Sequence, residues 1–514
     1  MEERVLVTNI VPEIDQVVKQ HLDKVYFDEM GTTHTYQDLL DASNSFAAWL
    51  DNSNIPAGSP IMFYGDHQFE MVAGFLGGLK SGHAYIPVET GSALPRMQSI
   101  INTAKPKLVV AVDDFPDQEL DYDGQVLNLF ELQKIMANHT PYSLDHEVKG
   151  DEPFYILFTS GTTGSPKGIE ISANNITTFA NWMLGDDFKL PREATFLGQP
   201  PFSFDISHFY WLVGMLSGAT VKAIPVKVVQ KFGQLFKVLP DLKINVFFGT
   251  PSFAELLLLS PDFNAEKMPD LQKFVFCGEE LTVSTVKRLF QKFPDAHIYN
   301  TYGPTEATVA VTSCEITKDM LKDAKRLPIG YDKPGVTTTI WDGDKQITEP
   351  GKHGEIIISG DSVAAGYLNN PEKTAKNFFK FNGQQSYRTG DAGYITADGL
   401  RHIIGRMDFQ IKLHGFRVEL DEVRSSLELS EYIKQAVAVP KYDKNGKATH
   451  LIAYVIAQPN DFDSDAELTK AIRDSLKDKI MDYMMPTQFI YVDSYPTSAN
   501  GKIAVKELIA EANK

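Results

Sequence analysis

The chain has 514 residues, too many for one compact hydrophobic core, so two or more domains are expected. Its 49 basic and 67 acidic residues give a net charge of −18, which argues against nucleic acid or an anionic membrane as the main partner. The two cysteines, Cys277 and Cys314, are too few for a disulfide framework or a cysteine-based metal site, and they suggest a reducing compartment.

The start of the chain, Met-Glu-Glu-Arg, lacks the basic start and apolar core of a signal peptide. No apolar run is long enough to span a bilayer. We therefore expect a soluble, cytoplasmic protein with no direct membrane insertion.

Most of the chain alternates short apolar runs, rich in β-branched residues, with amphipathic stretches. The predicted helices are Tyr36–Leu50 and Thr282–Phe293. The predicted strands are Lys107–Val112, Phe154–Phe158, Asn245–Phe248 and Lys273–Phe276. This alternation is typical of layered α/β folds with mainly parallel strands.

The pattern changes near residue 400, where residues 390–394 and 398–399 are interpreted as turns. A different alternation follows them. Its predicted elements are helices at Glu419–Leu429 and Ala466–Lys479 and strands at Ala436–Val439 and His450–Ile456. We place a domain boundary at Arg406–Phe409, with a large α/β domain over 1–406 and a small α+β domain over 407–514. From Phe409 onward the chain has 14 basic and 16 acidic residues, so the small domain is close to neutral and the large one strongly acidic.

A loop rich in glycines and hydroxyls follows the strand Phe154–Phe158. Residues 159–168 read Thr-Ser-Gly-Thr-Thr-Gly-Ser-Pro-Lys-Gly. Glycines let the backbone turn tightly with its N–H groups directed inward, and the hydroxyls and the lysine supply further donors for a polyphosphate. A flexible Ser/Gly loop is the simpler alternative for a short match. The Gly-Lys-Ser/Thr of a Walker site is missing, so this is a different phosphate loop. Its candidate phosphate-binding residues are Thr159, Ser160, Gly161, Thr162, Thr163, Gly164 and Lys167.

Seven motifs occur in order along nearly the whole chain. They are 159–168, Phe204–Ser207, Asn300–Glu306, Gly354–Tyr367, Tyr387–Asp391, Gly405–Glu419 and Asn500–Ile503. In type and order they resemble the adenylate-forming superfamily of acyl-CoA synthetases, peptide-synthetase adenylation domains and luciferases. The resemblance implies a large N-terminal region of layered α/β subdomains, a small mobile C-terminal α+β lid, and the use of ATP with Mg²⁺.

The resemblance also assigns roles to single residues. Tyr302 matches the aromatic residue that stacks on adenine, and Asp391 matches the carboxylate that binds the ribose hydroxyls. The candidate catalytic residues are Glu306, which matches the Mg²⁺ ligand, and Lys502, which matches a lysine that binds the substrate carboxylate and stabilises charge at the α-phosphate. The other nucleotide-binding candidates are Asn300, Thr301, Gly303, Pro304, Thr305, Ile403 and Arg406. A purely structural role could explain each of these residues taken alone. Their occurrence together, in family order, favours a role in binding the nucleotide.

Asp205 indicates the kind of acid that is activated. In members of the superfamily that activate amino acids, the aspartate of this Phe-Asp motif pairs with the substrate ammonium. Fatty-acid and aryl-acid members have no positive group there, and a buried carboxylate without a partner is costly. The alternative is that Asp205 is the N-cap of a helix over residues 206–216.

The segment Phe276–Leu281 reads Phe-Cys-Gly-Glu-Glu-Leu and is similar to that of the D-alanine–D-alanyl carrier protein ligases, a branch of the superfamily. These enzymes convert D-alanine to D-alanyl-AMP and transfer it to the phosphopantetheine thiol of a small acidic carrier protein, the first step of teichoic acid D-alanylation. By this resemblance, Cys277 walls a pocket for a methyl side chain, with Val309 nearby. A small buried hydrophobe is the alternative explanation of Cys277. The preference for D- over L-alanine rests on the resemblance alone.

In the superfamily the small domain rotates between adenylation and thiol transfer. Asp408 matches the hinge position. The resemblance implies that Lys502 serves the first step and that the loop at Gly415 replaces it for the second, where Lys412 is a further candidate. Because the carrier is acidic, the near-neutral small domain is the expected docking surface.

Several other functions stay open. An adenylation enzyme for another small amino acid and an acyl-CoA synthetase are the nearest, although Asp205 and the segment around Cys277 argue against an uncharged acid. A catalytically silent sensor on the same scaffold is disfavoured by the presence of Glu306, Asp391 and Lys502. A luciferase-like oxygenase is disfavoured by Asp205.

Overall fold

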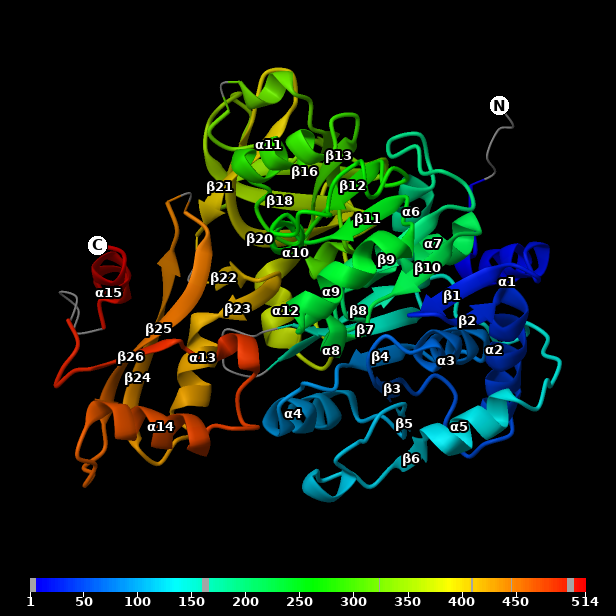
Figure 1. Ribbon diagram of the computed structural model, residues 1–514, viewed down its shortest axis with the longest axis horizontal. Helices are drawn as coiled ribbons and strands as arrows, with labels where there is room; N and C mark the ends of the chain where they lie inside the picture. Colours follow the sequence, from blue (N-terminus) through cyan, green and yellow to red (C-terminus); the bar gives the residue numbers. More distant parts are fainter. Residues whose placement is uncertain (1–5, 160–165, 323, 408–409, 445, 497–502) are drawn as a thin grey trace.

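The computed structural model describes residues 6–159, 166–322, 324–407, 410–444, 446–496 and 503–514 (Figure 1). Two mainly parallel sheets form the layers of the large region. The nine-stranded sheet has the order β15-β14-β13-β12-β11-β9-β10-β1-β2, and the six-stranded sheet has the order β6-β5-β3-β4-β7-β8. Antiparallel pairs lie at their edges: β1 with β2, β13 with β14, β14 with β15, and β7 with β8.

The strands of the nine-stranded sheet are β1 (Val25–Glu29), β2 (Thr32–Thr35), β9 (Thr195–Gly198), β10 (Thr220–Ala223), β11 (Val246–Gly249), β12 (Lys273–Phe276), β13 (His297–Tyr302), β14 (Thr312–Glu315) and β15 (Tyr331–Asp332). Those of the six-stranded sheet are β3 (Ile61–Tyr64), β4 (Tyr85–Val88), β5 (Leu108–Ala111), β6 (Gln125–Asn128), β7 (Pro153–Thr159) and β8 (Lys167–Ser172).

Helices cover both sheets. The α-helices of this region are α1 (Ile10–Gln20), α2 (Tyr36–Asp51), α3 (Phe69–Lys80), α4 (Leu94–Ala104), α5 (Leu129–Met136), α6 (Ala173–Met183), α7 (Trp211–Ser217), α8 (Val226–Val229), α9 (Phe232–Val238), α10 (Pro251–Leu257), α11 (Val283–Lys292) and α12 (Pro371–Asn377). Its 3₁₀ helices are η1 (Asp117–Glu119), η2 (Asp205–Phe209), η3 (Leu239–Leu242), η4 (Thr305–Ala307) and η5 (Asp319–Leu321).

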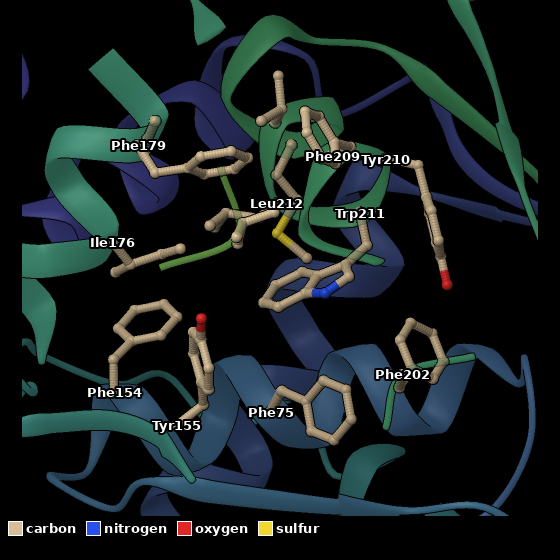
Figure 2. Close-up of a cluster of buried hydrophobic side chains, with 14 of the residues drawn as sticks. Phe75, Phe154, Tyr155, Ile176, Phe179, Phe202, Phe209, Tyr210, Trp211 and Leu212 are labelled. Atoms are coloured by element: carbon tan, nitrogen blue, oxygen red, sulfur yellow. The ribbon is translucent and has the colours of Figure 1, made fainter. Parts of the chain in front are cut away.

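The main hydrophobic core lies between the two sheets. Figure 2 shows its centre, where Phe75 of α3 and Tyr155 of β7 face Phe179 of α6 and Trp211 of α7. All four side chains are buried, and the rings of Phe75 and Trp211 lie 5.9 Å apart. Each aromatic side chain buries a large apolar area, so this cluster holds the two sheets in a fixed arrangement.

Local sequence explains the main elements. Thr35 caps α2, and Asp38 returns a bond to the Thr35 backbone, which forms a capping box. Strands β3, β5 and β11 are buried at every position, as expected for central parallel strands covered on both faces. The predicted helix Tyr36–Leu50 is observed as α2, and the predicted strand Lys273–Phe276 is β12, so the α/β prediction for this region is confirmed.

A third sheet follows, and here one prediction was wrong. Its strands are β16 (Val336–Asp342), β17 (Lys345–Ile347), β18 (Gly354–Gly360), β19 (Phe378–Phe381), β20 (Gln384–Ile395) and β21 (Arg401–Arg406), and their pairings are antiparallel. Residues 390–394, predicted as turns, belong to β20. A Cβ at Gly393 would lie 2.4 Å from the carbonyl oxygen of His402, so this glycine permits close approach of a neighbouring strand rather than a turn.

The C-terminal part has its own small sheets and core, as Figure 1 shows for the orange and red segments. Its strands are β22 (Gln410–Leu413), β23 (Phe416–Glu419), β24 (Ile433–Tyr442), β25 (Ala448–Ala457) and β26 (Gln488–Tyr491), and its helices are α13 (Leu420–Leu427), α14 (Asp465–Ser475), η6 (Asp482–Met484) and α15 (Val505–Ala512). Apart from Ala93, the buried residues of its two hydrophobic clusters all follow residue 410. This supports the boundary at Arg406–Phe409, which remains a prediction. Among the described residues, no helix combines the length and apolar character needed to cross a membrane.

Candidate functional site

A cavity of about 490 Å³ lies where the nine-stranded sheet meets the C-terminal part. Strands β11, β12 and β13 are parallel neighbours, and their carboxyl ends meet on this side of the sheet. Cys277 follows β12 directly and Gly303 follows β13, so both line the cavity. A cleft beyond the carboxyl ends of parallel strands is the usual place for a ligand in an open α/β sheet.

The structure brings most of the predicted site residues together. Those that line the cavity are Thr159, Asp205, Cys277, Asn300, Thr301, Tyr302, Gly303, Pro304, Thr305, Asp391, Ile403 and Arg406. Lys167, Glu306 and Val309 are buried and are not among the lining residues. Ser160, Gly161, Thr162, Thr163, Gly164, Asp408 and Lys502 lie outside the described residues.

Asp391 holds two of the nucleotide-binding candidates in the cavity, Tyr302 and Arg406. The Tyr302 hydroxyl donates to its Oδ2 at 2.6 Å, and Nη1 of Arg406 donates to its Oδ1 at 2.9 Å. Asn300 and Thr301 are directed differently. Their side chains donate to the backbone carbonyls of Pro328 and Phe276, at 2.7 and 2.8 Å, so they hold strand β13 in place.

Asp205 also lines the cavity, half-buried, as the first residue of η2. The N-cap position belongs to Phe204, and the expected single helix 206–216 is divided into η2 and α7, so the N-cap alternative for Asp205 does not hold. Burial raises the pKa of Asp205 to about 6, against the opposing effects of the Thr305 hydroxyl and the Lys412 ammonium.

A buried histidine, His208, forms a hydrogen bond with the backbone of Asp205. His208 Nδ1 lies 2.8 Å from the Asp205 carbonyl oxygen, and its Nε2 lies 2.6 Å from the Tyr85 hydroxyl. Burial lowers the pKa of His208 to about 3, so the ring is neutral. Because a carbonyl only accepts, Nδ1 carries the proton and Nε2 accepts from Tyr85. This bond ties the backbone of Asp205 to the aromatic core, because His208 stacks on Tyr155 with ring centres 4.4 Å apart.

Cys277 and Val309 are neighbours in the wall beside Asp205. The Cys277 thiol lies 3.7 Å from the Val309 carbonyl oxygen, and both side chains are buried. Burial raises the pKa of the Cys277 thiol to about 11, so it is not a nucleophile at neutral pH. Thr308 and Val309 have φ values of 60° and 65°, a left-handed conformation that is unfavourable for β-branched residues. Such strain persists only where the surrounding structure imposes it.

Glu306 lies behind the cavity wall in a charged cluster. Its side chain is fully buried and pairs with Nη1 of Arg417 at 2.9 Å, while the Tyr367 hydroxyl donates to it at 2.9 Å. Burial alone would raise the pKa of Glu306, but the charges of Arg417 and Lys167 lower it to about 2. Lys167 lies over the ring of Tyr367, 5.1 Å from its centre, and burial followed by the Arg417 charge lowers its pKa to about 8.

The hairpin of β22 and β23 forms the opposite wall, and we call residues 410–419 the Gly415 hairpin. Lys412, Gly415 and Arg417 line the cavity. The Gly415 N–H donates to the Glu279 carboxylate, which comes from the large region and is almost fully buried. Lys447 Nζ lies 3.6 Å from Glu279, which adds a second contact between the two parts of the chain.

Comparison with known proteins identifies this architecture. The family model described as AMP-binding enzyme matches residues 14–368, and the model of the AMP-binding enzyme C-terminal domain matches residues 422–502. The chain belongs to the AMP-binding enzyme family. Its membership implies the use of ATP, and the adenylate-forming resemblance of the motifs is confirmed.

Curated relatives are similar over their full length. The chain is 46% identical to a D-alanine–D-alanyl carrier protein ligase of Streptococcus agalactiae serotype V and 48% identical to one of Lactiplantibacillus plantarum, with 99% of this chain and 100% of each relative covered. Solved structures share the fold. The Vibrio cholerae adenylation domain AlmE has a TM-score of 0.80 at 19% identity, covering 99% of both chains. The Bacillus subtilis o-succinylbenzoate CoA synthetase has a TM-score of 0.82 at 19% identity, covering 96% of this chain and 98% of the other.

Sequence reasoning did not foresee two contacts of this AMP-binding enzyme. Arg417 was part of a recognised motif, but its ion pair with Glu306 joins residues 111 positions apart. Glu279 stood in the segment Phe276–Leu281, which carried no prediction for its side chain, and this side chain accepts a hydrogen bond from the Gly415 hairpin. The sequence showed only that Arg417 and Glu306 each belong to a motif. Their spacing along the chain could not show that the two side chains form an ion pair.

Proposed function

We propose that this AMP-binding enzyme activates D-alanine with Mg²⁺ and ATP as D-alanyl-AMP. It then transfers the D-alanyl group to the phosphopantetheine thiol of a carrier protein. The observation that carries the proposal is that the Asp205 carboxylate lines the same cavity as the nucleotide-binding candidates and as Cys277, whose thiol packs against Val309. A carboxylate there is a partner for an ammonium, and a wall formed by Cys277 and Val309 would favour a substrate with a methyl side chain.

The names of the full-length relatives support D-alanine and the carrier protein. The geometry supports a small amino acid and does not suit an uncharged acid, because an acyl-CoA synthetase substrate would leave the charge of Asp205 without a partner. The reaction consumes ATP, which supports a cytoplasmic location.

The proposed first step joins the substrate carboxylate to the α-phosphate, and pyrophosphate leaves. Asp205 would hold the ammonium, Asp391 the ribose and Tyr302 the adenine, so both reactants are oriented before attack. Lys502 would stabilise the charge that develops at the α-phosphate. Thr305, which lines the cavity, would contact the same phosphate.

Glu306 fits the Mg²⁺ that this step requires. Its carboxylate is ionised and already holds a cation, the Arg417 guanidinium. No cluster of three or more His, Cys, Asp or Glu that could hold a metal occurs in the part of the chain that the structure describes. A single carboxylate with phosphate oxygens and water is the ligand set that Mg²⁺ commonly takes, and the ion would neutralise the leaving pyrophosphate.

In the proposed second step the phosphopantetheine thiol attacks the adenylate carbonyl carbon, and AMP leaves. The Gly415 hairpin would line this site, and Lys412 would balance the charge of the adenylate. We propose that rotation about Asp408 exchanges this hairpin for Lys502 between the two steps. The near-neutral small domain would receive the acidic carrier.

The function is tested by amino-acid-dependent exchange between pyrophosphate and ATP, measured with D-alanine, L-alanine, glycine, D-serine and short fatty acids. D-Alanine should give the largest kcat/KM, and only D-alanine should be loaded efficiently onto a phosphopantetheinylated D-alanyl carrier protein. Exchange with fatty acids but with no amino acid would contradict the proposal.

The KM for D-alanine should depend on pH through Asp205. This group has a folded-state pKa raised to about 6 by burial, so it is ionised above pH 6 and loses its charge below it. The KM for D-alanine should therefore rise as the pH falls from 7 to 5, by up to about tenfold per pH unit below the pKa, while the KM for ATP changes less. Steady-state kinetics across this range check the effect. Residual activity of Asp205→Asn should show no such trend, and a D-alanine KM independent of pH would contradict the assignment.

Replacing Cys277 with alanine should enlarge the pocket and relax selectivity. Larger side chains, or L-alanine, should gain relative to D-alanine by about 1–3 kcal/mol in kcat/KM, because apolar size discrimination is modest. Cys314→Ala is a matched control, since this second buried cysteine lies on β14 and does not line the cavity. An unchanged substrate profile in Cys277→Ala would remove this residue from the specificity wall.

A further inference from the structure

We infer that Arg417 and Mg²⁺ occupy the Glu306 carboxylate in turn, so that departure of the metal admits the Gly415 hairpin to the site. The inference rests on the proposed function for the identity of the metal. It adds a positioning role for Arg417, which couples the end of the first step to the arrangement needed for the second.

The first observation is the ion pair itself. Nη1 of Arg417 lies 3.0 Å from Oε1 and 2.9 Å from Oε2 of Glu306, so this one guanidinium nitrogen is shared by both carboxylate oxygens. The Glu306 side chain is 0% exposed. A fully buried carboxylate requires a positive partner, because its lost hydration is otherwise uncompensated. In the arrangement described here, Arg417 is that partner.

The second observation is the position of Arg417 in the chain. It lies on β23, in the same hairpin as Gly415, whose N–H binds Glu279 of the large region. Phe416, between them, makes an edge contact with Phe204, with ring centres 4.8 Å apart. Arg417 is therefore carried by the same hairpin that Gly415 and Phe416 fasten to the large region, and withdrawal of the hairpin removes the Arg417 charge from Glu306.

The third observation concerns charge. Lys167 already contributes a positive charge near Glu306, since it lies over the ring of Tyr367, whose hydroxyl donates to Glu306. A divalent cation added beside a guanidinium and an ammonium, in a site shielded from water, would be strongly repelled. The same carboxylate can thus hold Mg²⁺ or Arg417, but not both. When Mg²⁺ leaves with pyrophosphate, the uncompensated Glu306 attracts Arg417 and the hairpin with it.

Hydrogen exchange of the Gly415 hairpin tests this coupling in the full chain. Peptides covering residues 410–419 are followed by mass spectrometry with AMP and pyrophosphate at saturating concentrations, with Mg²⁺ or with EDTA. In the unaltered enzyme, Mg²⁺ should speed exchange of the hairpin by about tenfold, because it displaces Arg417 and favours withdrawal. No amino acid is present, so the result does not depend on whether D-alanine is the substrate.

Three variants complete the test. Arg417→Gln should exchange rapidly with or without Mg²⁺, whereas Arg417→Lys should restore part of the response. Arg424→Gln is the matched control, since Arg424 lies on α13 of the same domain, is 40% exposed and pairs with Asp421 and Glu428; it should respond like the unaltered enzyme.

Glu306→Gln provides an independent variant should Arg417→Gln not fold, and its hairpin should be indifferent to Mg²⁺. Hairpin exchange that is unaffected by Mg²⁺ in the unaltered enzyme would overturn the inference. So would a Mg²⁺ response that persists in Arg417→Gln or, if that variant does not fold, in Glu306→Gln, because the ion pair would then be only a structural contact.

Discussion

Replacing Asp205 with alanine should abolish D-alanine-dependent pyrophosphate exchange while ATP binding survives. Loss of a charge-assisted pair with the substrate ammonium should cost about 2–5 kcal/mol in the binding of D-alanine. Tyr302 and Arg406 both donate to Asp391, so this group of nucleotide-binding candidates should stay intact. Exchange kinetics and calorimetric titration with ATP separate the two effects.

Two controls sharpen this result. Asp205→Asn retains the shape of the side chain and should be nearly as defective, because the charge is what is lost. Asp186→Ala removes an exposed carboxylate of the same region and should behave like the unaltered enzyme. If Asp205→Ala still activates D-alanine with an unchanged KM, this carboxylate does not bind the ammonium.

Replacing Lys502 with alanine should slow adenylate formation by a factor on the order of 10²–10³, the usual consequence of losing one group that stabilises transition-state charge. The same variant, supplied with D-alanyl-AMP, should still load a phosphopantetheinylated carrier, because the Gly415 hairpin and not Lys502 would line the site in that step. The two half-reactions must be assayed separately.

Lys506→Ala is the matched control for this experiment, since Lys506 is an exposed residue of α15 just beyond the same segment. Asp408→Pro should show the opposite defect, because proline fixes φ and would hinder rotation at the predicted hinge after adenylation. Equal loss of both half-reactions in Lys502→Ala would mean that one arrangement of the small domain performs all of the chemistry.

The sequence was most informative where a local pattern sufficed. Strands such as Lys273–Phe276 were visible as short apolar runs, and the helix that begins at Tyr36 was visible from its amphipathic period. Prediction from the sequence failed where long-range contacts override the local conformational preference. Gly390 and Gly393 suggested turns, yet both lie within β20, and Gly393 allows this strand to run closely beside its neighbours.

The same distinction applies to the candidate site. The ordered motifs assigned Asp205 and Asp391 to the site, and the segment around Cys277 added the third residue; all three line one cavity, and their roles stay predictions. The left-handed backbone at Val309 could not be foreseen, because a β-branched residue rarely adopts it and only the packed surroundings impose it. The ion pair of Glu306 with Arg417 could not be predicted either, because it depends on where the C-terminal part of the chain lies.

The burial of both native thiols has a practical consequence for labelling. Burial raises the pKa of Cys277 to about 11 and that of Cys314 to about 12, so at neutral pH both are almost entirely protonated and enclosed by protein. Maleimides and other alkylating reagents need an accessible thiolate, and they should react far faster with a cysteine introduced on the surface. Fluorophores or spin labels could therefore be attached to the large and small domains without first replacing the native cysteines. Cys277 would stay in place while the movement of the small domain is followed.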